Sequence, residues 1–148
     1  MPTTITTGIR IDAPADAVWA TLTDTSLFRE WNPFVTEIHG RLALGERLRV
    51  RIAPPGGAAM TFRPRITRFI PGRQLAWLGS FGVRGIFDGE HSFTIEPIGA
   101  HACRFTHAET FRGVLVPLMR GALARTESGF ELMNAALRDR VETVVPVR

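Results

Sequence analysis

The chain has 148 residues, which suits one domain with a hydrophobic core and is too short for two ordinary domains, so we treat residues 1–148 as a single domain. All 18 basic residues are arginine, and the sequence contains neither lysine nor tyrosine. This composition excludes a Schiff-base lysine, the lysine of a nucleotide-binding P-loop and a tyrosine general acid. The single cysteine, Cys103, cannot form an internal disulfide.

Positive charge is concentrated in one part of the chain. Residues 38–87 hold nine arginines and one acid, Glu46, whereas the formal net charge of the whole chain is only +4. Arg47, Arg49 and Arg51 alternate with apolar residues, which predicts the outer face of a strand. Because no aromatic residues interleave with them, we favour a solvated face over an anion-binding surface and expect no nucleic-acid partner. No apolar run approaches the length of a membrane span, so we expect no span and a cytoplasmic protein.

Hydrophobic periodicity predicts an α+β fold. A first strand is expected over residues 3–12, a short helix after Pro14 and a second short helix over residues 26–31. Six further strands are expected at residues 35–42, 46–53, 59–70, 74–80, 86–97 and 102–112. Short turns rich in glycine and proline separate these strands, which is typical of an antiparallel meander.

After Gly113 the period becomes helical and continues to about residue 142. A helix of this length must bury its apolar stripe, and the concave face of the sheet offers the largest apolar surface. We therefore expect a helix-grip fold, a curved seven-stranded antiparallel sheet wrapped around the long C-terminal helix. Where the sheet does not touch the helix, the gap would form a pocket.

Three polar residues lie on the apolar faces of the last two predicted strands. His91 shares its side of the strand with apolar residues, and so do His107 and Glu109. When two antiparallel strands pair, the residue numbers of any two facing residues on one side of the sheet add up to the same even number. A turn near Gly99 allows this sum to be 198 or 200. The first register places His91 opposite His107, and the second places it opposite Glu109.

Three roles are open for this trio. It can be a satisfied buried network that stiffens the sheet, the polar end of an apolar ligand cavity, or a catalytic or metal-binding group. No established metal motif or nucleophile motif accompanies it, so we expect no metal. The catalytic residues, if there are any, would be His91, His107 and Glu109.

Several local motifs resemble the SRPBCC superfamily, the START-like helix-grip proteins of the polyketide cyclase/dehydrase and lipid transport type. The segment RIDAPADAVW at residues 10–19 is similar to the superfamily's opening strand and helix, and WNPF at residues 31–34 is similar to the motif after the second helix. Residues 89–93 and 105–113 resemble a bacterial branch of the superfamily. The resemblance implies two short helices after the first strand and a hydrophobic small-molecule ligand held between the sheet and the C-terminal helix, with no cofactor.

Two other functions remain open. The resemblance also allows a polyketide cyclase or dehydratase-like enzyme that uses the His/Glu pocket, or a co-chaperone-like interaction module that docks through its basic sheet face. For the pocket protein, the expected ligand-binding residues combine the polar trio with large apolar side chains of the second short helix, of the predicted sheet and its turns, and of the long helix: Trp31, Phe62, Trp77, Phe81, His91, Phe93, Phe105, His107, Glu109, Met119, Phe130 and Met133.

Overall fold

A computed structural model describes residues 2–144 as an α+β arrangement of two antiparallel sheets and a long helix. The chain begins with β1 (Thr3–Ile11), followed by α1 (Ala15–Thr23), a 3₁₀ turn (Thr25–Leu27) and α2 (Phe28–Trp31). Seven strands follow: β2 (Val35–His39), β3 (Arg49–Ile52), β4 (Met60–Phe62), β5 (Arg65–Ile70), β6 (Gln74–Ser80), β7 (Asp88–Pro97) and β8 (Cys103–Arg112). A second 3₁₀ turn (Val116–Leu118) leads into α3 (Arg120–Val144).

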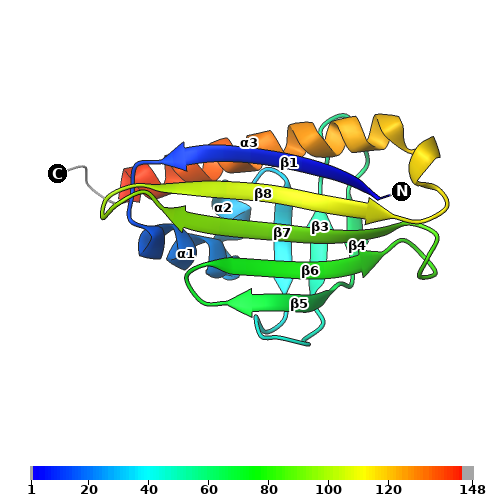
Figure 1. Ribbon diagram of the computed structural model, residues 1–148, viewed down its shortest axis with the longest axis horizontal. Coiled ribbons are helices and arrows are strands. Elements are labelled where there is room, and N and C mark those ends of the chain that lie inside the picture. Colours follow the sequence, from blue (N-terminus) through cyan, green and yellow to red (C-terminus); the bar gives the residue numbers. More distant parts are fainter. Residues whose placement is uncertain (1, 145–148) are drawn as a thin grey trace.

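The larger sheet has the strand order β1-β8-β7-β6-β5, so the first strand pairs with the last. The helix α3 runs alongside β1, at the edge of this sheet (Figure 1). Only the second half of α3 is buried. The buried residues of this helix begin at Gly129 and include Phe130, Met133, Leu137 and Val141. The long helix and the antiparallel sheet that the sequence predicts are therefore present.

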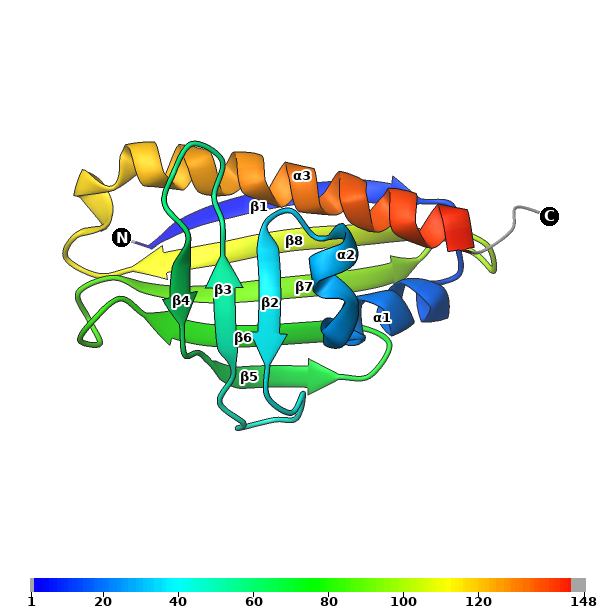
Figure 2. The same cartoon turned by 180° about the vertical axis from the view of Figure 1, so that it is seen from behind.

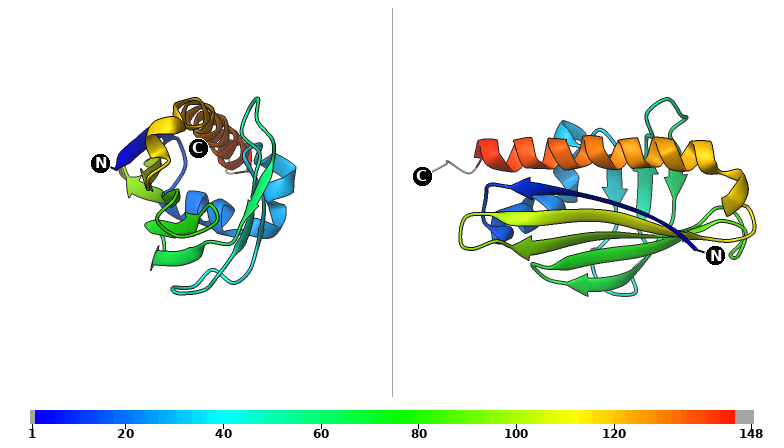
Figure 3. Two further views of the ribbon diagram at one scale, coloured as in Figure 1. Left: turned by 90° about the vertical axis from the view of Figure 1, so that its right-hand side faces the viewer. Right: turned by 45° about the horizontal axis from the view of Figure 1, so that its top comes forward.

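The smaller sheet, β2-β3-β4, lies on the opposite side of the molecule, and its strands cross those of the larger sheet (Figure 2). The two sheets meet where the backbone N–H of Leu48 donates to the carbonyl of Pro64 at 2.8 Å, beside an isolated bridge between Arg47 and Arg65. Seen from its end, the molecule is a ring formed by the two sheets and α3 (Figure 3).

The strand count differs from the prediction of seven strands in one sheet. Within residues 2–144 there are eight strands in two sheets, because the strand predicted over residues 59–70 is divided into β4 and β5. Pro64 lies at the division. Proline has no N–H to donate and cannot occupy the middle of a ladder, so the chain leaves one sheet at this residue and enters the other.

The helical segments also differ in detail from the prediction. The second short helix, expected over residues 26–31, is a 3₁₀ turn followed by the single helical turn of α2. The long helix begins at Arg120 rather than directly after Gly113, and Leu118, in the intervening segment, is 79% exposed. Pro117 lies in the intervening 3₁₀ turn, where it needs no hydrogen-bond acceptor. Across the part of the chain that is described, no helix has both the length and the apolar character that a membrane crossing requires.

Candidate functional site

A cavity of about 370 Å³ lies between the two sheets, under the first half of α3. The large sheet contributes Trp77 and Phe111, the small sheet contributes Val50 and Phe62, and α3 contributes Leu123. The polar side chains on its wall are few: Ser80, His91, Glu109, Arg125 and Thr126. An apolar cavity with a small set of polar groups is typical of sites for small molecules.

The strand register brings His91 and Glu109 together. β7 and β8 pair with His91 opposite Glu109 and Phe93 opposite His107, which is the register with a sum of 200. All four side chains lie on the inner face of the sheet because they occupy alternate positions of the two strands. The diagonal neighbours His91 and His107 still meet, since their rings lean toward each other across the two strands.

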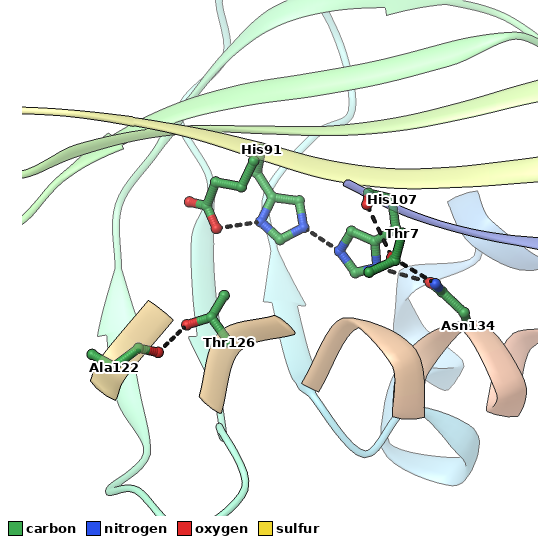
Figure 4. A network of polar contacts seen from close by, with 7 residues as sticks. Thr7, His91, His107, Ala122, Thr126 and Asn134 are labelled. Atoms are coloured by element: carbon green, nitrogen blue, oxygen red, sulfur yellow. Dashed lines mark hydrogen bonds and ion pairs between the residues drawn. The ribbon is translucent and has the colours of Figure 1, made fainter. Parts of the chain in front are cut away.

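A chain of hydrogen bonds runs from the two histidines through Asn134 of α3 to the edge strand β1 (Figure 4). The Nε2 atoms of His91 and His107 are 2.5 Å apart, and His107 Nδ1 is 3.0 Å from Asn134 Oδ1 on α3. Asn134 Nδ2 donates to Thr7 Oγ1 of β1 at 2.8 Å, and the Thr7 hydroxyl donates to the His107 carbonyl at 3.0 Å. We call Thr7, Asn134, His107 and His91 the polar relay.

Aromatic rings enclose both histidines. The His107 ring stacks on Phe130 with 3.8 Å between ring centroids, and the His91 ring lies 5.2 Å from that of Trp77 and 4.8 Å from that of Phe93. His107 is fully buried. Burial, reinforced by the neighbouring His91, lowers the pKa of His107 well below the ordinary value for histidine, and the hydrogen bond to Asn134 only partly opposes this. His107 is therefore neutral at neutral pH.

Glu109 lies beside the second ring nitrogen of His91, Nδ1. Its Oε1 atom lies 3.4 Å from His91 Nδ1, which is within ion-pair distance, but the geometry is not that of a hydrogen bond. His91 Nδ1 is consequently a buried atom without a hydrogen-bond partner. The Glu109 carboxylate lies where a side chain at Gly89 of β7 would stand, so the missing side chain of this glycine makes room for it.

The structure divides the predicted ligand-binding residues into two groups. Six of them line the cavity: Phe62, Trp77, Phe81, His91, Glu109 and Met119. The other six do not line it: Trp31, Phe93, Phe105, His107, Phe130 and Met133. Trp31 packs against Phe28. The remaining five are buried in the core: Phe93, Phe105 and His107 on the large sheet, and Phe130 and Met133 on the second half of α3. The inner face of the large sheet is thus covered by solid core at one end and open to a cavity at the other.

Sequence analysis missed Asn134 and Thr7, although both lie on predicted apolar surfaces. Asn134 follows Phe130 by four residues on the buried stripe of α3, and Thr7 shares a strand face with Ile5 and Ile9. A polar residue on an apolar stripe was the signal in each case. It could not show which strand and which helix meet, because residues 7 and 134 are far apart in the chain.

The polar groups of the site do not form a metal centre in the part of the chain that is described, residues 2–144. No three histidine, cysteine, aspartate or glutamate side chains are placed there to hold an ion. The Nε2 atoms of His91 and His107 point at each other rather than at a common point. The chemistry that the arrangement supports is hydrogen bonding to a ligand and proton exchange through His91 and Glu109.

The fold is that of a helix-grip protein with an apolar cavity between its sheets and its long helix. Residues 2–142 match the family described as polyketide cyclase / dehydrase and lipid transport, and the chain belongs to this family. The resemblance to the SRPBCC superfamily is thereby confirmed. No curated protein matches the sequence.

Solved structures of the same fold share little sequence with this chain. The aromatase/cyclase Zhui from Streptomyces sp. R1128 superposes with a TM-score of 0.81 at 15% identity, over 99% of this chain and 98% of that chain. A START superfamily protein from Mycobacterium smegmatis gives 0.73 at 19% identity, over 96% and 99%. Norcoclaurine synthase from Thalictrum flavum, in complex with dopamine and hydroxybenzaldehyde, gives 0.74 at 12% identity, over 99% and 90%. At these identities the likeness concerns the fold.

Proposed function

We propose that the protein binds an apolar small molecule in the cavity between its two sheets and the first half of α3. The observation that carries the proposal is the cavity itself, about 370 Å³ of space with mainly apolar walls. His91 and Glu109 form the polar end, where they orient a hydroxyl or carbonyl group of the ligand. The family description, which includes lipid transport and polyketide cyclases, supports a ligand of this kind.

Filling the cavity tests the proposal. Ala122 lines the cavity, whereas Ala124, two residues further along α3, is exposed. A naphthalene-sulfonate probe, titrated by fluorescence, should bind wild type and Ala124→Phe with equal affinity and bind Ala122→Phe at least about tenfold more weakly, since the new ring takes the ligand's space. Native mass spectrometry of freshly purified protein checks for a retained ligand. Equal probe affinity in all three proteins contradicts binding in this cavity.

Acid-base catalysis on the bound ligand is the second candidate function. Of the three candidate catalytic residues, His91 and Glu109 lie on the cavity wall, and His107 lies behind His91 with no exposed surface. A direct proton transfer to or from a ligand therefore falls to His91 or Glu109, while His107 supports His91 from behind. This candidate rests on the cyclase members of the family and on the contact between His91 Nδ1 and Glu109.

Separating the two functions requires binding and turnover to be measured on the same compounds. Aromatic and linear polyketones would be incubated with the protein and their products followed by mass spectrometry. For an enzyme, Glu109→Gln should abolish product formation while the compound still binds. For a carrier, the compounds leave the cavity unchanged in wild type and variant alike, and the enzyme assignment fails.

A further inference from the structure

Each hydrogen bond of the polar relay has one possible donor and one possible acceptor, and Thr7 sets this direction. A threonine hydroxyl has one proton, and here it is donated to the His107 carbonyl. The oxygen of Thr7 can therefore only accept from Asn134, which must turn its Nδ2 atom toward Thr7. This fixes the amide, so its Oδ1 atom faces His107 Nδ1 at 3.0 Å. Since an amide oxygen only accepts, His107 carries its proton on Nδ1.

The direction then continues to His91. With its one proton on Nδ1, neutral His107 presents a lone pair at Nε2. The short contact between the two Nε2 atoms is a hydrogen bond only if His91 is the donor. The Nε2 proton of His91 is thus committed to His107. The remaining nitrogen, His91 Nδ1, faces the cavity side and Glu109.

Between His91 Nδ1 and the Glu109 carboxylate, no proton is available for a hydrogen bond if His91 is neutral and Glu109 is ionised. If His91 were neutral, the lone pair of its Nδ1 would face a carboxylate oxygen 3.4 Å away, and two acceptors in a buried position repel each other. His91 Nδ1 has no hydrogen-bond partner that would relieve this. The neutral ring of His107 is already committed to His91 through its Nε2 atom. Arg125 on α3 is the one other charged residue on the cavity wall within the described residues. One additional proton, on His91 Nδ1 or on Glu109, removes the repulsion.

We propose that Thr7 and Asn134 are positioning residues that, through His107, make the His91–Glu109 pair hold one proton. The pair is then neutral overall, either as imidazolium and carboxylate or as imidazole and carboxylic acid. A bare carboxylate on an apolar wall would select an ammonium group, whereas a neutral pair selects an uncharged hydroxyl or carbonyl group. The ligand part of this inference rests on the proposed function, and the protonation part does not.

Nitrogen-15 NMR of the ligand-free protein tests the direction of the relay. In the wild type we expect His107 to be protonated at Nδ1 and His91 at Nε2. The opposite pattern, with His107 protonated at Nε2 and His91 at Nδ1 alone, overturns the proposal. In that pattern Asn134 donates to His107, and Glu109 is a bare carboxylate that accepts from His91.

Two substitutions at Thr7 separate a positioning role from a structural one. Thr7→Ser keeps the hydroxyl and should keep the wild-type nitrogen pattern. Thr7→Val removes the acceptor of Asn134 Nδ2, so that the amide is free to rotate and the direction of the relay reverses. Asn134→Asp provides a second check, because a carboxylate can only accept and so retains the Nδ1 proton of His107. An unchanged pattern in Thr7→Val contradicts the positioning role.

Matched aromatic probes test the ligand class. Wild type and Thr7→Ser should bind 2-naphthol at least about tenfold more tightly than 2-(aminomethyl)naphthalene, whose ammonium group meets a neutral pair and the positive charge of Arg125. In Thr7→Val this preference should shrink several-fold. Tighter binding of the amine by wild type overturns the predicted selectivity. If neither probe binds, both the proposed function and the predicted ligand class are rejected. The nitrogen spectra still decide the direction of the relay.

Discussion

His107 makes stability depend on pH. Its pKa is lowered in the folded protein, mainly by burial, so below about pH 6.5 the unfolded chain takes up a proton that the folded chain does not. The contribution of His107 to the free energy of unfolding is therefore fully present above this pH and is lost as the pH decreases, by up to about 1.4 kcal/mol per unit. Urea denaturation at about pH 8 and about pH 5.5 measures the change. In His107→Gln the loss should be smaller, and an equal loss would assign it to other groups.

Gly89 controls the position of the Glu109 carboxylate. A methyl group at residue 89 would occupy the place of Glu109 Oε2, and the backbone of this glycine does not require a positive φ. Gly89→Ala should therefore push the carboxylate away from His91 and weaken binding of 2-naphthol by about tenfold, the loss of one good hydrogen bond. Gly79 lines the same cavity, and a methyl group there makes an ordinary 3.5 Å contact with Pro64. Gly79→Ala should leave Glu109 in place and bind the probe nearly as well as wild type does.

The polar trio could be predicted from sequence because a strand alternates strictly between two faces. Parity alone placed His91, His107 and Glu109 on one side of the sheet, and the turn near Gly99 limited the register to two choices. The direct link between His91 and His107 could not be predicted. It depends on side chains leaning across the register in which Glu109, not His107, is opposite His91.

At the scale of elements, the two halves of α3 pack against different parts of the molecule. Its first half lies over the cavity through Ala122, Leu123 and Thr126, and its second half is packed into the core from Gly129 onward. Gly129 marks the change, because the Phe34 ring lies where its side chain would be. The helix can approach the small sheet closely only at a residue without a side chain.

Substitutions of two glycines in α3 should have opposite effects. Gly129→Ala inserts a methyl group into the Phe34 ring and should lower the free energy of unfolding by about 1 to 3 kcal/mol. Gly121→Ala meets nothing closer than the Arg125 side chain at 3.7 Å, and its better helix propensity should raise stability by up to about 1 kcal/mol. Thermal unfolding of the two variants gives the comparison. A loss of stability in Gly121→Ala as large as that in Gly129→Ala would contradict this packing argument.

Periodicity predicted the kind and order of most elements but not the division into two sheets. The strands β6, β7 and β8 follow the prediction closely, since each has a clear alternating pattern. The long helix is also present, although it begins several residues later than predicted. In the strand predicted over residues 59–70, the apolar alternation of Met60 and Phe62 continues past Pro64 to Ile66. Whether a proline ends a strand or lies at a sheet edge depends on the neighbouring strands, which a local pattern does not contain.

At the scale of the whole molecule, the basic face and the cavity lie on opposite sides of the small sheet. Arg49 and Arg51 are exposed on β3, while Val50 between them lines the cavity. Neither arginine is in an ion pair within the described part of the chain. The alternation of β3 therefore separates a charged outer surface from an apolar inner one, and each can be changed without the other.

A double variant, Arg49→Ser with Arg51→Ser, tests whether the basic face serves the cavity. Binding of the naphthalene-sulfonate probe should be unchanged, because these side chains point away from the ligand and surface charges interact weakly with a buried group at physiological ionic strength. Fluorescence titration at two salt concentrations provides the measurement. A clear loss of affinity in the double variant would show that the face takes part in binding, as an interaction surface would require.

The polar relay also has a consequence for the order of folding. Thr7 comes from the first strand and Asn134 from the last helix, and β1 pairs with β8, about a hundred residues later in the chain. During synthesis the hairpin of β7 and β8 can form as soon as it leaves the ribosome, but the inner face of the sheet remains uncovered until α3 follows. A nascent chain that ends before Gly129 should therefore expose the aromatic core and bind chaperones. The histidines acquire their fixed protonation only in the final step, when the relay closes.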